Sequence, residues 1–477
     1  MTAIAPGIPV HSHTDDALGT DDATALAARL ASGEVSLGEV IGAAIARARQ
    51  VEPSLAAIAC DDFARAATLQ KLPARGLFAG VPTFIKDNTP VAGLPTGHGS
   101  AAVQPGPEKH NGPFTKQLLA QGLVCLGKSR LPEFGFNAST EPAHDRATAN
   151  PWHPAYSAGA SSGGSAALVA AGVVPIAHTN DGGGSTRIPA ACCGLVGLKP
   201  SRGRLVDGEA ARALPLNIIA EGVVTRNVRD TARFYLGAER SYRNPDLPAI
   251  GEITGPASRR LTIGLVTDSL NGLRTDAATR DSVEATARQL ADLGHRIELM
   301  PVPVNRHFAE DFALYWAMLA FAVSTTGKRT IHRSFDRRRV DGLTRGLDRM
   351  FRRQFYRLPA ALLRLRRSQR YYHQAIKGFD AVLTPVLGHG TPELGYLSPD
   401  LPFDTLFERL RRYVCFTPLA NATGAPAISL PLGRDAAGLP LGIQLMARHG
   451  DEKTLLELAF ELEAACPWPH PGIALSR

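Results

Sequence analysis

The chain has 477 residues, of which 44% are hydrophobic and 20% are charged, and its formal net charge is +8 at pH 7. This composition is that of a globular protein with a large core, and it excludes a small scaffold held by disulfides. The N-terminal residues 1–20 contain neither the basic nor the apolar stretch of a signal peptide. The longest apolar runs, 166–177 and 312–323, have 12 residues each, so no membrane span is expected.

Six cysteines occur without a Cys-x-x-Cys pair, and there is no His-Glu-x-x-His motif. The sequence therefore predicts no disulfide framework, no metal site and no cofactor. We expect the adjacent residues Cys192 and Cys193 to be packed in the core rather than to act as thiol nucleophiles. This use of cysteine predicts a reducing, cytoplasmic location.

Helical and extended patterns alternate along the chain, which predicts an α/β fold. Residues 21–50 have the spacing of two helices separated at Ser32-Gly33, with Ser36 as the cap of the second helix. A turn leading into a buried strand is expected over 77–86, and a strand, a helix and a second strand are expected at the following positions: 261–267, 277–293 and 296–301. No low-complexity linker divides the chain, so we expect one domain over residues 1–477, with an N-terminal helical segment at 20–75.

The positive charge is concentrated in residues 328–377, which contain sixteen lysines and arginines and three aspartates. Leucines and aromatic residues recur there at spacings of three and four, the pattern of amphipathic helices with solvated arginine faces. A surface that binds nucleic acid or an anionic membrane is the alternative interpretation. We favour the solvated face and expect no nucleic-acid partner.

Two glycine-rich clusters contain the candidate nucleophiles. Ser161 lies in a Gly-x-Ser-x-Gly stretch, the elbow of α/β-hydrolases, and an esterase of that class would also need a histidine downstream. No histidine lies in a stretch that identifies it as this partner. Ser185 follows Gly182, Gly183 and Gly184, whose N–H groups are suited to surround the oxyanion of a tetrahedral intermediate. A phosphate-binding loop is disfavoured because no Gly-Lys-Ser/Thr sequence is present.

Three stretches, GVPTFIKD, GASSGGSAALVAAG and NDGGGSTRIPAACCGLVGLKPSRGR, resemble the amidase signature family of serine amidohydrolases. The likeness extends from about Thr20 to GLPLGIQLMARHGDEKTLL near the C-terminus. It implies the amidase signature fold, a single large mixed β-sheet covered by helices on both faces. It also implies an amidase that cleaves carboxylic amide C–N bonds through an acyl-enzyme. The NDGGGS form is similar to that of 6-aminohexanoate-cyclic-dimer hydrolases and many bacterial amidases.

In this family the catalytic triad is a lysine, a serine that follows a cis peptide bond, and a nucleophilic serine. Carried onto this sequence, these residues are Lys86, Ser161 and Ser185. Lys86 follows two apolar residues, and an apolar environment would lower its pKa enough for the neutral amine to act as a base. The structural alternative for Lys86 is a salt bridge with the adjacent Asp87.

Asp181 and Arg187 flank the turn that carries Ser185, and an ion pair between them would fix the loop. The resemblance also implies a small-molecule amide substrate, and it places a helical, basic insertion at 302–378 near the substrate entrance. Phe134, Phe136 and the run 312–323 are candidate walls of an apolar pocket, although a core helix explains the run equally well.

Three other identities stay open at this point. The A subunit of the glutamyl-tRNA amidotransferase belongs to the same family, but Ile188 and the stretch SRGRLVDG depart from its usual pattern. A binding protein that has lost catalysis would lack part of the triad, whereas all three residues are present. The third is the esterase that uses Ser161. We favour a stand-alone hydrolase, and the sequence is compatible with a homodimer.

Overall fold

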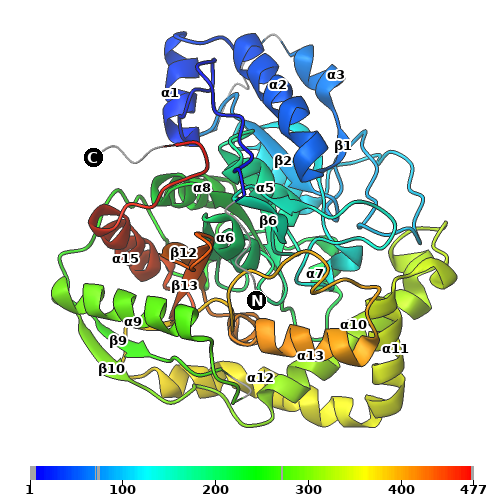
Figure 1. Cartoon of the computed structure of the whole chain (residues 1–477), viewed down its shortest axis with the longest axis vertical. Coiled ribbons are helices and arrows are strands. Elements are labelled where there is room, and N and C mark those ends of the chain that lie inside the picture. The colour runs from blue at the N-terminus through cyan, green and yellow to red at the C-terminus, as the bar shows by residue number, and fades with distance from the viewer. Residues whose placement is uncertain (1–6, 70, 72–75, 270–271, 474–477) are drawn as a thin grey trace.

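The computed structural model describes residues 7–69, 71, 76–269 and 272–473 (Figure 1). Its centre is an eight-stranded mixed sheet with the strand order β10-β9-β11-β13-β12-β7-β8-β6. The strands are β6 (Ile176–Asp181), β7 (Val196–Lys199), β8 (Ala220–Thr225), β9 (Thr262–Leu265), β10 (Arg296–Leu299), β11 (Ala381–Pro385), β12 (Ala427–Arg434) and β13 (Pro440–Ala447). Every residue of β6, β7, β8, β11 and β13 is buried, so both faces of these strands are covered.

A second sheet has three strands in the order β1-β3-β2. These strands are β1 (Ile58–Asp61), β2 (Pro82–Lys86) and β3 (Val124–Ser129). Strand β2 packs against β6, which is an edge strand of the large sheet. A ribbon of β4 (Ala149–Asn150) and β5 (His153–Ser157) completes the extended structure. The predicted α/β fold with a large mixed sheet is confirmed, with the three strands of this smaller sheet beside it.

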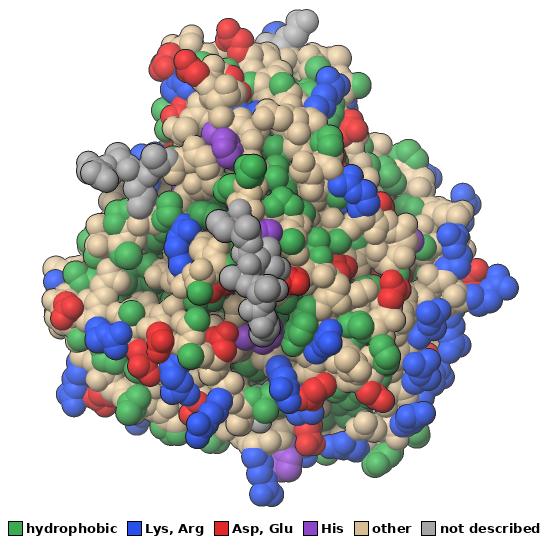
Figure 2. Space-filling model, in the orientation of Figure 1, with side chains coloured by type: hydrophobic (Ala, Val, Ile, Leu, Met, Phe, Trp, Pro, Cys, Tyr) green, Lys and Arg blue, Asp and Glu red, His purple; other side chains and the backbone are tan. Residues whose placement is uncertain are grey.

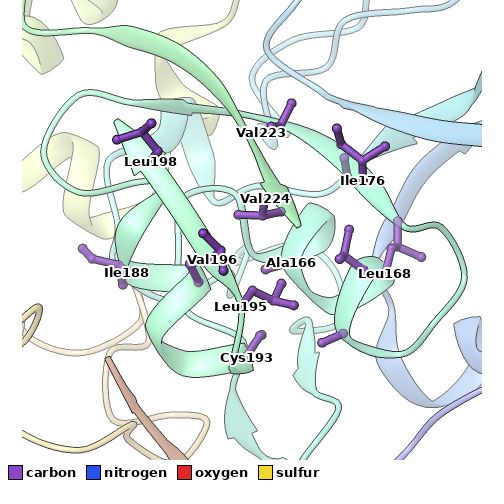
Figure 3. Close-up of a cluster of buried hydrophobic side chains, with 14 of the residues drawn as sticks. Ala166, Leu168, Ile176, Ile188, Cys193, Leu195, Val196, Leu198, Val223 and Val224 are labelled. Atoms are coloured by element: carbon purple, nitrogen blue, oxygen red, sulfur yellow. The ribbon is translucent and has the colours of Figure 1, made fainter. Parts of the chain in front are cut away.

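Two short buried helices anchor the turns that carry the candidate serines. Helix α5 (Gly163–Ala170) begins directly after Ser162, and α6 (Arg187–Cys193) follows the Ser185 turn. Every residue of both helices is buried. Figure 3 shows their side chains packed with those of β6, β7 and β8, among them Ala166, Leu168, Ile176, Ile188, Val196 and Val224. Close packing of this kind fixes the position of each turn.

The N-terminal part contains α1 (Ala23–Ser32), α2 (Leu37–Leu55) and α3 (Phe63–Ala67). Gly33 ends α1, and Ser36 caps α2 together with Glu39 in a capping box, which confirms the two predicted helices. Strand β1 interrupts the expected helical segment because it pairs with β3. Residues 70 and 72–75 of that segment, and residues 1–6 and 474–477 of the predicted domain, lie outside the described residues.

Further α-helices lie outside residues 308–375. They are α4 (Pro113–Leu119), α7 (Glu209–Arg212), α8 (Val228–Ser241), α9 (Ala277–Asp292), α13 (Phe403–Tyr413), α14 (Pro418–Thr423) and α15 (Glu452–Ala465). Among them, α8, α9 and α15 pack against strands of the large sheet. The predicted strand, helix and strand over 261–301 are present as β9, α9 and β10, with β9 and β10 parallel. The strand predicted at the end of 77–86 is β2.

Residues 308–375 form three helices, α10 (Phe308–Thr330), α11 (Gly342–Gln354) and α12 (Leu358–Ala375). Helices α11 and α12 both pack against α10. Lysine and arginine side chains gather at the right-hand edge in Figure 2, over α11. No helix in the described part of the chain is long and apolar enough to cross a membrane.

Candidate active site

Lys86 ends strand β2, and its side chain is completely buried. Its Nζ donates hydrogen bonds to Ser161 Oγ at 2.7 Å and to Asn180 Oδ1 at 2.8 Å. Burial lowers the pKa of Lys86 to about 7 because the charged amine loses its hydration. The alternative salt bridge with Asp87 is wrong, since that carboxylate pairs with Lys128 at 3.0 Å. Lys86 is therefore a buried amine that can lose its proton near neutral pH.

Ser161 lies in the turn that leads into α5, and the Ala160–Ser161 peptide bond is cis. A second short segment approaches its hydroxyl: a Cβ added to Gly135 would be 3.0 Å from Ser161 Oγ. The next residue, Ser162, donates its backbone N–H to the carbonyl oxygen of Ser185 at 3.3 Å. The turns that carry the two candidate serines are thus directly adjacent.

The loop between β6 and α6 holds three glycines ahead of the half-buried Ser185. Gly184 has a φ of +128°, and a Cβ there would be 2.4 Å from Thr417 Oγ1, so a side chain does not fit. Its N–H donates to Asp181 Oδ1 at 2.7 Å, whereas the N–H groups of Gly182 and Gly183 have no acceptor among the described residues. Of the three predicted oxyanion donors, the N–H groups of Gly182 and Gly183 are therefore available to a ligand, whereas the N–H group of Gly184 holds the loop.

Asp181 and Arg187 form the predicted ion pair, and both side chains are completely buried. Arg187 Nε donates to Asp181 Oδ2 and Nη2 to Oδ1, each at 2.9 Å, which is bidentate geometry. Burial alone would raise the pKa of Asp181, but the Arg187 guanidinium and a hydrogen bond from Asn421 outweigh it and hold the pKa well below its usual range. The Asp181 carboxylate therefore stays ionised and continues to accept the hydrogen bond from the Gly184 N–H.

Three side-chain and backbone groups from the C-terminal part complete the environment of Arg187. It donates to the carbonyl of Thr417 at 2.9 Å, to Gln444 Oε1 at 2.6 Å and to Asn421 Oδ1 at 2.8 Å. The Thr417 hydroxyl also donates to the carbonyl of Gly183 at 2.6 Å. These partners bind the loop from segments more than two hundred residues away in the sequence.

His178 on β6 supports Lys86 rather than a serine. Its Nδ1 accepts the backbone N–H of Lys86 at 3.2 Å, and its Nε2 lies 2.9 Å from Glu221 Oε2. Burial lowers the pKa of His178, against the hydrogen bond and charge of Glu221, so we assign the neutral ring with Nε2–H donating. Both ring nitrogens are occupied, and the group bound to Ser161 Oγ is a lysine. This arrangement does not supply the histidine that the α/β-hydrolase elbow requires.

Asn180, which accepts a hydrogen bond from Lys86, was not predicted from the sequence, and neither were the three C-terminal partners of Arg187. Asn180 is the first residue of NDGGGS, and Asn421 lies in LANATGAPAISLP, so both are inside stretches that carry the family likeness. Cys192 and Cys193 are buried, and burial raises the pKa of both thiols, as expected for packed residues. In the parts of the chain that the structure describes, no group of three or more metal-ligating side chains is arranged to hold an ion.

Known proteins are similar to this chain in sequence and in fold. A model of the amidase family matches residues 39–456. The chain is 50% identical over 474 residues to the protein named "Putative amidase AmiC" of Mycobacterium tuberculosis, with 98% of this chain and 99% of the relative covered. It is 33% identical over 479 residues to the 6-aminohexanoate-cyclic-dimer hydrolase of Paenarthrobacter ureafaciens, with 94% and 95% covered.

A solved structure of a 6-aminohexanoate cyclic dimer hydrolase superposes with a TM-score of 0.86 at 31% identity, over 96% of this chain and 99% of that one. The chain belongs to the amidase family. It is an enzyme that hydrolyses amide bonds, and its substrates are small molecules. The amidotransferase subunit and the Ser161 esterase are not favoured, because the relatives matched from end to end are named amidases and a cyclic-dimer hydrolase.

Proposed function

We propose that this amidase works through an acyl-enzyme on Ser185, with Lys86 as the base and Ser161 as the proton relay. The observation that carries the proposal is the 2.7 Å hydrogen bond from the buried Lys86 amine to Ser161 Oγ, beside a turn joined to Ser185. A pKa of about 7 makes Lys86 a base at neutral pH, as general base catalysis requires.

In acylation, neutral Lys86 takes the proton of Ser161 as Ser161 takes that of Ser185. The Ser185 oxygen attacks the amide carbon, and the electrons of the C=O double bond move to the oxygen. Collapse of this intermediate breaks the C–N bond, and the proton returns through Ser161 to the leaving amine. Water then attacks the acyl-enzyme through the same relay, which releases the carboxylic acid and restores Ser185.

The oxyanion is stabilised by the N–H groups of Gly182 and Gly183 in this proposal. Gly184 contributes by holding the loop, since its N–H already donates to Asp181. Because Asp181 and Arg187 are buried and bound on all sides, the donors are held in place before substrate arrives, which makes them effective for the transition state. Asp181 and Arg187 are positioning residues and do not react.

A covalent probe tests the identity of the nucleophile. A fluorophosphonate or sulfonyl fluoride, followed by peptide mapping, is expected to modify Ser185, because its adduct gains oxyanion stabilisation. Ser185→Ala should abolish both labelling and turnover. The matched variant Ser161→Ala should slow both and leave residual reaction. An adduct on Ser161, together with loss of activity on replacing a histidine, would overturn the proposal and restore the elbow hydrolase.

The substrate is proposed as a linear or cyclic amide, in keeping with relatives named for amidase and cyclic-dimer hydrolase activity. The segment 302–378 is proposed to border the substrate entrance, supported by the position of α10 beside the glycine loop. A cytoplasmic location is supported by six cysteines that are all free. A single domain and a homodimer also remain proposals, and light scattering measures the second.

A further inference from the structure

The proposed mechanism sets the direction in which a substrate lies. The leaving amine receives its proton from Ser161, so the nitrogen of the amide must face that hydroxyl. The acyl chain, on the other side of the carbonyl carbon, must then point away from Ser161. Gly135 borders Ser161 on the amine side, with Phe134 and Phe136 next to it and their ring centroids 6.1 Å apart.

Two apolar side chains lie beside the glycine loop. A Cβ added to Gly182 would be 3.5 Å from Ile219 Cγ1, and one added to Gly183 would be 3.7 Å from Phe312 Cε1. Ile219 precedes β8, and Phe312 lies in the first turns of α10. Both are half-buried, whereas Phe308, which stacks on Phe312 with ring centroids 6.0 Å apart, is 2% exposed. Part of each side chain is therefore open beside the open amides.

The surroundings of this wall are apolar except for Asp207. Its half-buried carboxylate accepts a hydrogen bond from the Asn217 side chain and lies near the charges of Arg212 and Arg202. Phe312 and Ile219 pack against one hydrophobic cluster that includes Leu216, Ile218, Phe308, Tyr315 and Leu419. The polar groups there are engaged: Asn217 Oδ1 accepts the Ile219 N–H at 3.0 Å, and the Tyr315 hydroxyl donates to the Leu216 carbonyl at 2.6 Å. The charge of Arg202 is directed to the Asn217 carbonyl. None of these groups offers a free partner to a charged acyl chain.

We infer that Phe312 and Ile219 form the wall of an acyl subsite, which makes amides of uncharged, apolar carboxylic acids the substrate class of this enzyme. The inference rests on the proposed role of Ser185. The ring of Phe312 limits the size of the acyl group, because it lies beside the amides that hold the carbonyl oxygen. A hydrophobic wall discriminates by about 10-fold or more for each methylene that fits or fails to fit.

Anilides with one constant amine test the acyl side alone. The series is acetyl, butyryl, hexanoyl, branched pivaloyl and 6-aminohexanoyl 4-nitroanilide, with kcat/KM measured for each. The native enzyme should prefer butyryl or hexanoyl over the charged 6-aminohexanoyl group by at least about 10-fold. Phe312→Ala should raise the pivaloyl-to-acetyl ratio of kcat/KM by about 10-fold, and Phe312→Trp should lower it.

The matched control is Phe321→Ala, the same substitution on the same helix. Phe321 packs on Phe351 with ring centroids 4.9 Å apart and lies under Arg352, so it belongs to the α10–α11 contact. Its replacement should leave the acyl ratios unchanged. Equal changes in both alanine variants, or native turnover of the charged anilide as fast as that of the butyryl anilide, would overturn the inference.

A second series separates this inference from the proposed nucleophile. This series keeps the butyryl group constant and varies the ring of the aniline. Phe312→Ala should leave the relative kcat/KM values of these anilides unchanged. If Phe312→Ala changed them while leaving the acyl series unchanged, the inferred orientation of the substrate would be wrong. Ser185→Ala should stop turnover of every anilide. If the Ser185→Ala variant stayed active, the proposed mechanism would be wrong. If it were inactive while the Phe312 variants kept native ratios, only the acyl subsite would be wrong.

Discussion

Charged side chains have opposite environments in the glycine loop at 181–187 and on the basic helices α11 and α12. In the loop, Asp181 and Arg187 are completely buried and each is bound by several partners. On α11, Arg352 pairs with Asp348 at 3.0 Å while 41% of its side chain stays exposed. The most charged segment of the sequence is therefore not the segment whose charges determine the geometry of the site. A buried pair fixes geometry, whereas an exposed pair is screened by water.

The largest effect is expected at the buried amine of the site. Lys86→Ala removes the proposed base and should lower the acylation rate by about 10²- to 10⁴-fold, the usual contribution of general base catalysis. Stopped-flow release of nitroaniline from a butyryl anilide measures this rate, and circular dichroism checks that the variant is folded. Near-native acylation in a folded Lys86→Ala protein would show that the buried Lys86 amine has no role in the reaction. The site would then not differ in this respect from the exposed charges of α11 and α12.

The buried pair of the loop is compared directly with an exposed pair by two equal substitutions. Arg187→Met leaves the buried Asp181 carboxylate without its charged partner and should reduce the free energy of unfolding by about 3–5 kcal/mol. Arg352→Met on α11 should change it by less than about 1 kcal/mol. Urea denaturation of both variants measures the difference, and similar losses would show that the two regions do not differ in this respect.

The pH dependence of kcat/KM tests the protonation state of the buried amine. Protonated Lys86 cannot accept a proton, so activity should be low in acid and rise with pH through about 7, the pKa that burial gives this amine. Asn180 accepts a hydrogen bond from Lys86 Nζ at 2.8 Å and so favours the charged form. Asn180→Leu should therefore move the rising limb to lower pH.

Asn88 provides the control for that shift. Its side chain exchanges hydrogen bonds with Asn180 but is not bonded to Lys86, so Asn88→Ala should move the limb less than Asn180→Leu does. A limb that stays at the same pH in both variants, or that moves to higher pH in Asn180→Leu, would contradict the assignment of this pKa to Lys86.

The smallest effect is expected on the basic helices. Replacing the exposed residues Arg349, Arg353, Arg367 and Arg370 by glutamine should leave turnover and melting temperature close to native. Binding to anionic vesicles and to tRNA, measured at two salt concentrations, should be weak in the native protein. Tight, salt-sensitive binding that the four substitutions abolish would identify this face as a partner surface instead.

Much of the site was predictable because its residues lie in contiguous motifs. Lys86, Ser161 and the glycine loop are each marked by a short pattern, and the ion pair of Asp181 with Arg187 follows from their spacing around the turn. The engagement of the Gly184 amide was not predictable, because it depends on the path of the loop. The same holds for the separation of the smaller sheet, since strand pairing between distant segments leaves no local pattern.

The partners contributed by distant parts of the chain could not be derived from local pattern either. Gln444 and Asn421 reach Arg187 across more than two hundred residues, and Phe312 reaches Gly183 from a helix whose apolar run also fits a core element. A residue's own neighbours in sequence report its secondary structure, but only the assembled sheets determine which loop it faces.

The contact between Arg187 and Gln444 spans 257 residues and has a consequence for the order of synthesis. A growing chain carries Lys86, Ser161 and Ser185 long before the ribosome adds the segment with Thr417, Asn421 and Gln444. Until α14 has formed and β13 has joined the sheet, the guanidinium lacks its last acceptors and these contacts cannot hold the loop. We therefore expect a nascent chain that already contains Lys86, Ser161 and Ser185 to lack the fixed loop of the full protein until its synthesis is almost complete.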